Sequence, residues 1–285
     1  MIAFVILHFQ AIEETNRCVE SIQFNVAGEK KIIIVDNASP NQSGPQLKKY
    51  YEEDTDVLVL LNGKNEGFAR GNNIGYKECK KYHPDFIVVL NSDTLILQPN
   101  FADQITEAFS KYQFDVLGPD IISTKTRLHQ NPQRDRNFNL HELEKKRRWL
   151  IFKNANKWAV WLKYALSKSK TKNIKSNNNH TDIQIGKVLH GAFYVFSRKF
   201  IEKHSCCFYD NTFMYYESYI LHYLGMKEDM VFLYYPAIQV FHIEDASTDF
   251  TYRTQYRKSV WTNRCLLDSC TEFIRLQKDK TVKLQ

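Results

Sequence analysis

The 285-residue chain is long enough for one large domain or two small ones. Since 43% of its residues are hydrophobic and 14% are aromatic, it can bury a sizeable core. With only 10 Gly and 7 Pro, its composition excludes collagen-like and low-complexity proteins. The net charge of +7 is uneven, since residues 125–175 hold 15 Lys and Arg against Asp135, Glu142 and Glu144. We therefore expect a negatively charged partner at this segment.

No apolar run approaches the roughly 20 residues that a membrane-spanning helix needs, so we expect a chain that does not cross a bilayer. Residues 1–9 are apolar but lack a basic segment and a cleavage site, which favours a first strand over a secretory signal. The cysteines lack the spacing of a zinc site or a disulfide scaffold, so we expect reduced thiols and a cytosolic setting. They are Cys18, Cys79, Cys206, Cys207, Cys265 and Cys270.

Apolar, β-branched runs alternate with helical patterns in the first third of the chain. The runs cover residues 2–7, 32–35, 57–61 and 86–90. Between them, Cys18, Ile22 and Val26 repeat at helical spacing, and residues 68–81 follow a Gly-containing turn. This order predicts an α/β fold with a mostly parallel central sheet that is flanked by helices.

The alternation of apolar runs with helical patterns ends at about residue 120. We expect one domain of residues 1–250 that contains a basic helical insertion at about 125–180. Regular structure resumes at 187–196, with a helix start at 197–199 and strands at 231–235 and 238–241. Residues 251–285 predict a C-terminal helical tail.

Polar clusters follow three of the predicted strands, where parallel sheets bind their ligands. They contain Asp36 and Asn37, then Asn65, Gly67 and Arg70, then Asn91, Ser92 and Asp93. Asp36 suits a ligand contact or an Asx turn. The Gly-containing second cluster permits close backbone approach to a ligand but lacks the glycine patterns of NAD and ATP sites. An unpaired carboxylate at Asp93 would be costly unless it met a cation or solvent, and its alternative role is a turn or helix-cap residue. Mg²⁺ or Mn²⁺ commonly takes one or two carboxylates together with phosphate oxygens.

Together these clusters resemble the successive motifs of family 2 glycosyltransferases of the GT-A fold, particularly the rhamnosyltransferase-like branch. The second half continues the resemblance in order over about residues 2–250. His190-Gly191-Ala192 resembles the acceptor-side strand, residues 208–217 resemble F-D-x-x-F-F-M-Y-x-E, and residues 242–247 resemble H-x-x-x-x-S.

The resemblance implies a role for each of these residues. Residues in the first two clusters would bind the nucleotide-sugar: Asp36, Asn37, Asn65, Gly67 and Arg70. Asn91, Ser92 and Asp93 would continue this site, with Asp93 holding Mn²⁺ or Mg²⁺ and Asn91 replacing the first acid of D-x-D. His242 would be a further metal ligand or a phosphate contact, and its alternative is a structural histidine. His190, Gly191 and Ala192 would lie on the acceptor side.

The catalytic base is the point at which the chain departs from the family. Relatives carry Glu-Asp-x-Asp or Glu-Glu-x-Asp, whereas this chain reads Glu217-Ser218-Tyr219-Ile220. Glu217 is then the candidate base for inverting transfer, and Asp210 is the reserve. The missing acids also leave open a non-catalytic nucleotide-sugar or polysaccharide-binding subunit.

Apolar residues on one predicted helical face of the basic segment oppose several lysines. The apolar face holds Ile151, Ala155, Trp158, Leu162, Ala165 and Leu166, and Lys153, Lys157 and Lys163 lie broadly opposite. Such a helix suits an anionic membrane interface, and its alternative is a helix packed on the domain. A nucleic-acid partner is not expected, because no nucleic-acid module accompanies the charge.

These observations predict a metal-dependent, inverting glycosyltransferase with a UDP- or dTDP-sugar donor. Its acceptor would be a surface polysaccharide, lipid-linked and reached from the cytoplasmic face of the membrane, where the protein would be peripheral. A sugar nucleotidyltransferase is the other enzyme considered, although the chain lacks that class's Gly-rich, basic loop after the first strand.

Overall fold

The computed structural model describes residues 1–156, 158, 180–244 and 255–284. Within these residues, nine strands form one sheet in the order β3-β2-β1-β4-β8-β6-β9-β5, with β7 paired to β9. The strands are β1 (Ile2–His8), β2 (Lys30–Asp36), β3 (Val57–Leu61), β4 (Phe86–Asn91), β5 (Thr94–Ile96), β6 (Val116–Ser123), β7 (Gln184–Ile185), β8 (Phe193–Ser197) and β9 (Phe232–His242).

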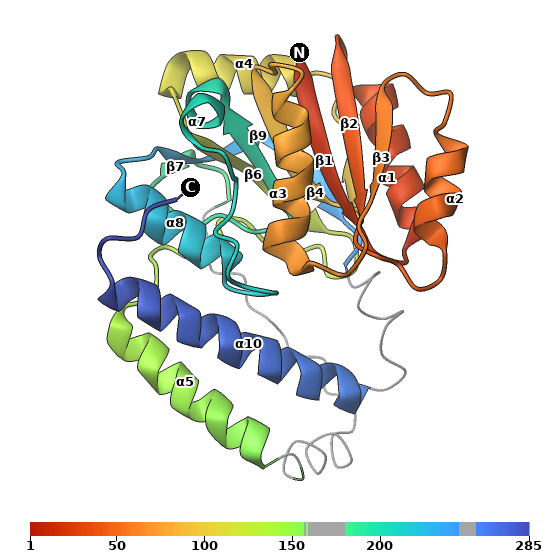
Figure 1. Ribbon diagram of the computed structural model, residues 1–285. Coiled ribbons are helices and arrows are strands. Elements are labelled where there is room, and N and C mark those ends of the chain that lie inside the picture. The colour runs from red at the N-terminus through yellow and green to blue at the C-terminus, as the bar shows by residue number, and fades with distance from the viewer. Residues whose placement is uncertain (157, 159–179, 245–254, 285) are drawn as a thin grey trace.

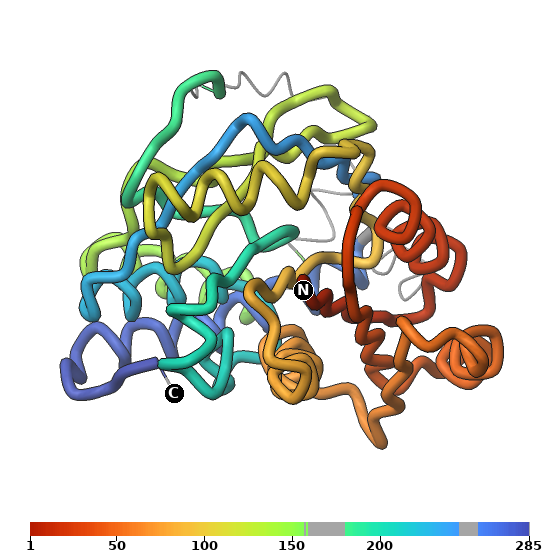
Figure 2. The backbone as a smooth tube through the Cα atoms, turned by 90° about the horizontal axis from the view of Figure 1, so that it is seen from above, coloured from red at the N-terminus to blue at the C-terminus, as the bar shows by residue number. Residues whose placement is uncertain are grey.

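Helices lie on both sides of this sheet (Figures 1 and 2). They are α1 (Ile12–Asn25), α2 (Ser43–Tyr50), α3 (Gly67–Lys80), α4 (Phe101–Tyr112), α5 (Leu140–Ala155), α7 (Arg198–Lys203), α8 (Glu217–Lys227) and α10 (Gln255–Lys278). Buried residues of α1, α2 and α4 share one apolar cluster, and those of α3, α7, α8 and α10 share the other. The predicted α/β fold with a helix-flanked central sheet is therefore confirmed.

The parallel half of the sheet follows the sequence prediction closely. Strands β3, β2, β1 and β4 pair in parallel. In β2, Ile33 and Val35 enter one core cluster and Ile32 and Ile34 enter the other, so the whole run is buried. A strand covered on both faces has no polar side to alternate with, which explains its continuous apolar sequence.

The other half is mixed, and one prediction there was wrong. Residues 231–235 and 238–241 were expected as two strands, but residues 232–242 form the single strand β9. Its parallel pairing with β6 shifts between Pro119 and Asp120, where Tyr235 is the partner of the first and Gln239 of the second. This irregularity accommodates Pro236, which has no N–H for a regular ladder.

Helices α5 and α10 lie side by side below the sheet (Figure 1). The Cys270 thiol donates to the Leu143 carbonyl (Sγ···O 3.5 Å), and the Asn154 amide donates to the Asn263 carbonyl (3.0 Å). The helices are therefore antiparallel. Helix α5 begins with a capping box, in which Asn139 and Glu142 each accept a hydrogen bond from the other's backbone N–H.

The basic insertion is thus partly an ordered helix that packs on the C-terminal one. Leu162, Ala165, Leu166, Lys157 and Lys163 of its predicted faces lie outside the described residues. The boundaries at 1–250 and 251–285 stay a prediction.

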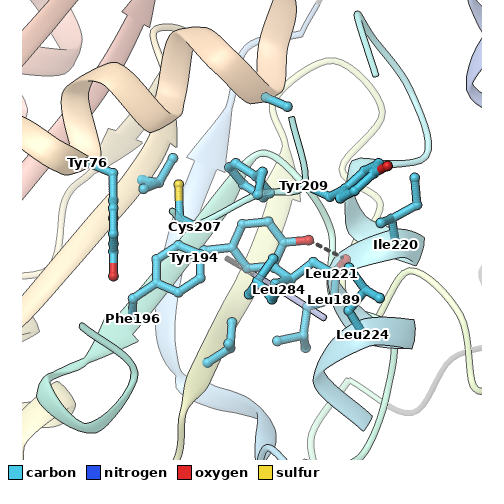
Figure 3. Packing of buried hydrophobic residues seen from close by; sticks show 14 of the residues in the cluster. Tyr76, Leu189, Tyr194, Phe196, Cys207, Tyr209, Ile220, Leu221, Leu224 and Leu284 are labelled. Atoms are coloured by element: carbon cyan, nitrogen blue, oxygen red, sulfur yellow. Dashed lines mark hydrogen bonds between the residues drawn. The ribbon is translucent and has the colours of Figure 1, made fainter. Parts of the chain in front are cut away.

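Tyr194 of β8 lies in the core beside Leu189, the residue that precedes the predicted acceptor-side segment (Figure 3). Its ring is buried, and its hydroxyl donates to the Leu189 carbonyl at 3.0 Å. Tyr209, Ile220 and Leu221 belong to the same cluster. The residues that precede His190 and those around Glu217 therefore share one packed core.

Candidate active site

The polar clusters meet at one edge of the sheet because the parallel strands end level with one another. His8 at the end of β1 pairs in register with Asp36 at the end of β2, and Leu7 pairs with Asn91 at the end of β4. Asp36 in turn pairs with Leu61 at the end of β3. The sequence-based expectation of a common rim therefore agrees with the strand register.

Asp36 is buried against the first turn of α2. Both of its carboxylate oxygens accept from the Ser39 N–H, at 3.2 and 3.3 Å. A Cβ at Gly44 would come within 2.2 Å of Oδ2, so only glycine lets the helix approach this closely. Burial raises the pKa of the Asp36 carboxyl, and the Ser39 hydrogen bonds oppose that rise.

Asn37 ties the loops after β2 and β3 together. Its side-chain N–H groups donate to the Asn65 side chain (3.0 Å) and to the Gly67 carbonyl (3.1 Å). Its Oδ1 accepts from the Asn62 side chain (3.2 Å) and from the Glu66 N–H (2.9 Å). All of this buried amide's usual hydrogen bonds are made within the protein, so in this structure Asn37 shapes the loop.

Gly67 has a contact that its sequence context does not reveal. It adopts φ +78°, and a Cβ there would lie 2.2 Å from the Phe213 carbonyl oxygen. That oxygen accepts from the Phe68 N–H at 2.7 Å. The loop after β3 therefore packs backbone to backbone against the segment that leads to Glu217.

Arg70 and Asp210 are also neighbours across this contact. The exposed Arg70 donates from Nε to the Asp210 main-chain carbonyl at 2.9 Å. The Asp210 side chain is half-buried. The arginine predicted for the nucleotide pocket thus lies beside the reserve candidate for the base.

Asp93 and His242, the two predicted metal ligands, face each other. Asp93 Oδ1 lies 3.2 Å from His242 Nε2, and both side chains are largely buried. Strand β5 brings them together, because Thr94 pairs in register with His242. The other ring nitrogen, Nδ1, is 2.8 Å from Gln130 Oε1 and donates to it.

The donor set of this pair fits a divalent cation. With its proton on Nδ1, a neutral His242 presents the Nε2 lone pair to a carboxylate oxygen, and two such acceptors need a proton or a cation between them. A carboxylate and an imidazole are ordinary ligands for Mn²⁺. No group of three or more His, Cys, Asp or Glu ligands occurs within the described ranges, so phosphate oxygens or water would have to complete the shell.

The acceptor-side segment adjoins both this pair and the candidate base. The Asn91 N–H donates to the Ala192 carbonyl at 2.9 Å. The His190 and His242 ring centroids are 6.1 Å apart, and burial lowers the pKa of His190 to about 4. A Cβ at Gly191 would lie 3.0 Å from the Ser218 hydroxyl, so α8 starts directly against this segment. Ser92 is buried between Asn91 and Asp93.

Glu217 is the first residue of α8 and is 9% exposed. The Thr212 hydroxyl donates to its Oε1 at 3.3 Å. Burial raises the pKa of the Glu217 carboxyl from 4.5 to about 7, although hydrogen bonds to its oxygens oppose the rise. A carboxyl that titrates near neutral pH can both accept and release a proton there.

Several residues that support the site were not predicted as site residues. His8 is buried and hydrogen-bonded to Thr15 and Ser43, and burial lowers its pKa to about 4. Gln130 fixes the His242 ring, and Asn73 holds the backbone before the base candidate. Most of their partners are far away in the sequence, such as Ser43 for His8 and Phe208 for Asn73, so no local signal marks them.

A family model described as Glycosyl transferase family 2 matches residues 3–205. The chain belongs to this family. No curated protein matches it. None of the helices in the described part of the chain is long and apolar enough to cross a membrane.

Solved structures with similar folds include GalNAc-T7 with UDP, GalNAc and Mn²⁺, at 14% identity and TM-score 0.58, covering 100% of this chain and 55% of that one. Another is S. aureus TarS 1-349 in complex with UDP, at 10% identity and TM-score 0.54, covering 92% of this chain and 64% of that one. S. aureus TarS itself matches at 11% identity and TM-score 0.53, over 85% and 36%. This chain spans between 36% and 64% of the length of these three structures, and at such identities the likeness concerns the fold, GT-A.

Proposed function

We propose that this member of family 2 is an inverting glycosyltransferase. It would move a sugar from a UDP- or dTDP-sugar to a hydroxyl group of a surface-polysaccharide acceptor that is lipid-linked. One observation carries the proposal: the segment of residues 190–192 adjoins both the facing Asp93 and His242 side chains and the start of α8, where the buried Glu217 stands. The TarS and GalNAc-T7 structures were solved with UDP, which supports a UDP-sugar donor.

Asp93 and His242 would hold Mn²⁺ or Mg²⁺ together with the donor. The ion, when bound, would neutralise charge on the leaving diphosphate. Asp36, Asn65 and Arg70 would contact the nucleoside from the rim, while Asn37 and Gly67 hold that rim in shape. Asn91 and Ser92 would continue the donor site toward Asp93.

Glu217 would take the proton of the attacking acceptor hydroxyl. In this step the acceptor oxygen bonds to the anomeric carbon, the bond from that carbon to the diphosphate oxygen breaks, and the hydroxyl proton passes to the carboxylate. Burial raises the Glu217 pKa toward neutrality, so the carboxylate is a stronger base than an exposed one. The Thr212 hydroxyl holds Oε1 in place.

Helix α5 would place the enzyme on an anionic membrane surface. Its exposed apolar side chains are Trp149, Ile151 and Phe152, at 55, 45 and 51% exposure, and Trp158 beyond its end is 67% exposed. Lys145 and Arg148 are exposed on the same helix. Exposed aromatic and basic side chains on one helix favour lipid headgroups and the acyl boundary beneath them. We therefore propose peripheral attachment at the cytoplasmic face.

A co-sedimentation experiment tests the membrane proposal. Lys145→Glu with Arg148→Glu should reduce pelleting with anionic vesicles, while Lys48→Glu with Lys49→Glu on α2 removes the same charge and should not. Equal pelleting of both double variants, or equal pelleting with neutral and anionic vesicles, would contradict it.

Incubation with UDP- and dTDP-sugars, Mn²⁺ and a lipid-linked glycan tests the reaction, with nucleoside diphosphate release as the readout. We expect release from one donor, and its loss in Glu217→Gln. The missing acids after Glu217 favour a second candidate, a non-catalytic nucleotide-sugar-binding subunit. Tight donor binding with no release from any donor would support this second candidate and refute transfer.

A further inference from the structure

Helix α10 contacts the segment of residues 208–217, here called the base loop, at several points. The Ser269 hydroxyl donates to the Met214 carbonyl at 2.8 Å, and Ser269 is 2% exposed. The Tyr215 hydroxyl lies 3.3 Å from the Thr262 hydroxyl. These contacts come from a helix that begins 50 residues after the family match ends at residue 205.

Two further α10 residues hold the start of the base loop. The Arg275 guanidinium donates to the Tyr209 hydroxyl at 2.7 Å, and that hydroxyl also contacts Glu272. On the opposite side, the Phe213 carbonyl accepts from the Phe68 N–H. The base loop therefore contacts both α10 and the start of α3, where the loop after β3 ends.

The backbone of the base loop needs such support. Tyr215 and Tyr216 have φ of 74° and 68°, and they directly precede Glu217. Two consecutive bulky residues in the left-handed region are strained and persist only where surrounding contacts hold them. The Tyr216 ring packs on Phe273 of α10 and on Phe138.

We propose that α10 is a positioning element of the active site, and that Ser269 fixes the direction of the Glu217 carboxyl by holding the Met214 carbonyl. This inference rests on the proposed role of Glu217 as the base. Ser269 touches no reacting atom; it acts through the Met214 carbonyl and the two strained residues, Tyr215 and Tyr216, that follow it. Without its hydrogen bond, the Met214 carbonyl is free to turn and Glu217 loses its fixed place at the start of α8.

Ser269→Ala tests the inference, with Ser269→Thr as the conservative rescue. Thr271→Ala is the matched control, because that exposed hydroxyl donates to the Leu267 carbonyl of its own helix and to no other group in the described part of the chain. We expect kcat to fall about 10- to 100-fold in Ser269→Ala, as misplacement of a reacting group does, with the donor KM unchanged. Thr271→Ala should keep the wild-type kcat, and Ser269→Thr should restore most of it.

A second measurement needs no activity, so it separates this inference from the proposed function. Glu217→Gln is made in the wild-type and Ser269→Ala backgrounds, and the pH dependence of the melting temperature is compared. If Ser269 keeps the carboxyl buried, the pH-dependent change in melting temperature caused by Glu217→Gln should be at most half as large in the Ser269→Ala background as in the wild-type background. An unchanged effect together with an unchanged kcat would overturn the inference. An inactive wild-type enzyme whose pH-dependent effect still shrinks would refute transfer and leave the positioning role standing.

Discussion

Replacing Glu217 by Gln should remove activity and at the same time stabilise the fold at neutral pH. Burial raises the pKa of this carboxyl from 4.5 to about 7, a difference that corresponds to about 3 kcal/mol between its charged and neutral forms. Glutamine has nearly the same shape and no charge, and its Oε1 can still accept from the Thr212 hydroxyl. The substitution therefore removes the cost of burying a carboxylate and the proton acceptor together.

The sign follows from the protons bound in each state. Below pH 4.5 the carboxyl is protonated in both the folded and the unfolded chain, so the wild type and the Glu217→Gln variant should be similarly stable. Between pH 4.5 and 7 the unfolded chain has released this proton while the folded chain keeps it, so stability falls as pH rises. Above pH 7 the loss is complete, and the variant should be more stable by about 3 kcal/mol.

Melting curves from pH 4.5 to 8.5 measure this effect. For a chain of this size, about 3 kcal/mol corresponds to roughly 5–10 °C in melting temperature. Glu272→Gln is the control of opposite sign, because hydrogen bonds from Arg275 lower the pKa of Glu272 and its carboxylate stabilises the fold above that pKa. In transfer assays, loss of a general base should lower the rate about 10²- to 10⁴-fold.

Two results would refute this reasoning. If Glu217→Gln and wild type melt alike at pH 8.5, the carboxylate is not buried at a cost. If the variant transfers sugar within a few-fold of the wild-type rate, the base is Asp210 or no protein group, and Asp210→Asn then decides between them.

Three further substitutions have definite expected outcomes. In Asp93→Ala, the affinity for UDP should no longer depend on Mn²⁺, and calorimetric titrations with and without the ion that still differ would exclude this ligand. Gly67→Ala should lower stability in urea by at least about 1 kcal/mol, because its φ is +78° and an added Cβ would overlap the Phe213 carbonyl oxygen, whereas the Cβ of Gly63→Ala meets no atom within 4 Å and this substitution should be nearly neutral. Asn73→Ala should cost about 2–4 kcal/mol of stability, because its buried amide satisfies backbone groups of Cys207 and Phe208 at the start of the base loop, and a loss below about 1 kcal/mol would show that water replaces it.

The parallel half of the fold was predictable because its signals are local. Four apolar runs and the polar residues that follow them define both the strands and the rim, and strand register then brings Asp36 and Asn91 to one edge. The contact between Asp93 and His242 was predictable only through the family resemblance, because 149 positions separate the two residues. The antiparallel pairing of β5 with β9 brings them together.

The support of the base loop was not predictable in the same way. The pairing of α5 with α10 joins Leu143 to Cys270, and nothing near either residue indicates its partner. Gly67 looked like a residue that admits a ligand, whereas the observed contact is with the Phe213 carbonyl, 146 positions later. Sequence periodicity reports burial but not which surfaces meet.

The four side-chain hydrogen bonds of Asn37 have a consequence for how this chain can evolve. Because one buried amide joins the Asn62 and Asn65 side chains to the backbone of residues 66–67, a change at position 62 or 65 takes one hydrogen-bond partner from Asn37, and a change at position 37 releases both loops. Homologues should therefore vary at positions 37, 62 and 65 together rather than singly. The two loops would then be inherited as one unit, while the exposed Arg70 beside them is free to diverge with the donor that each relative uses.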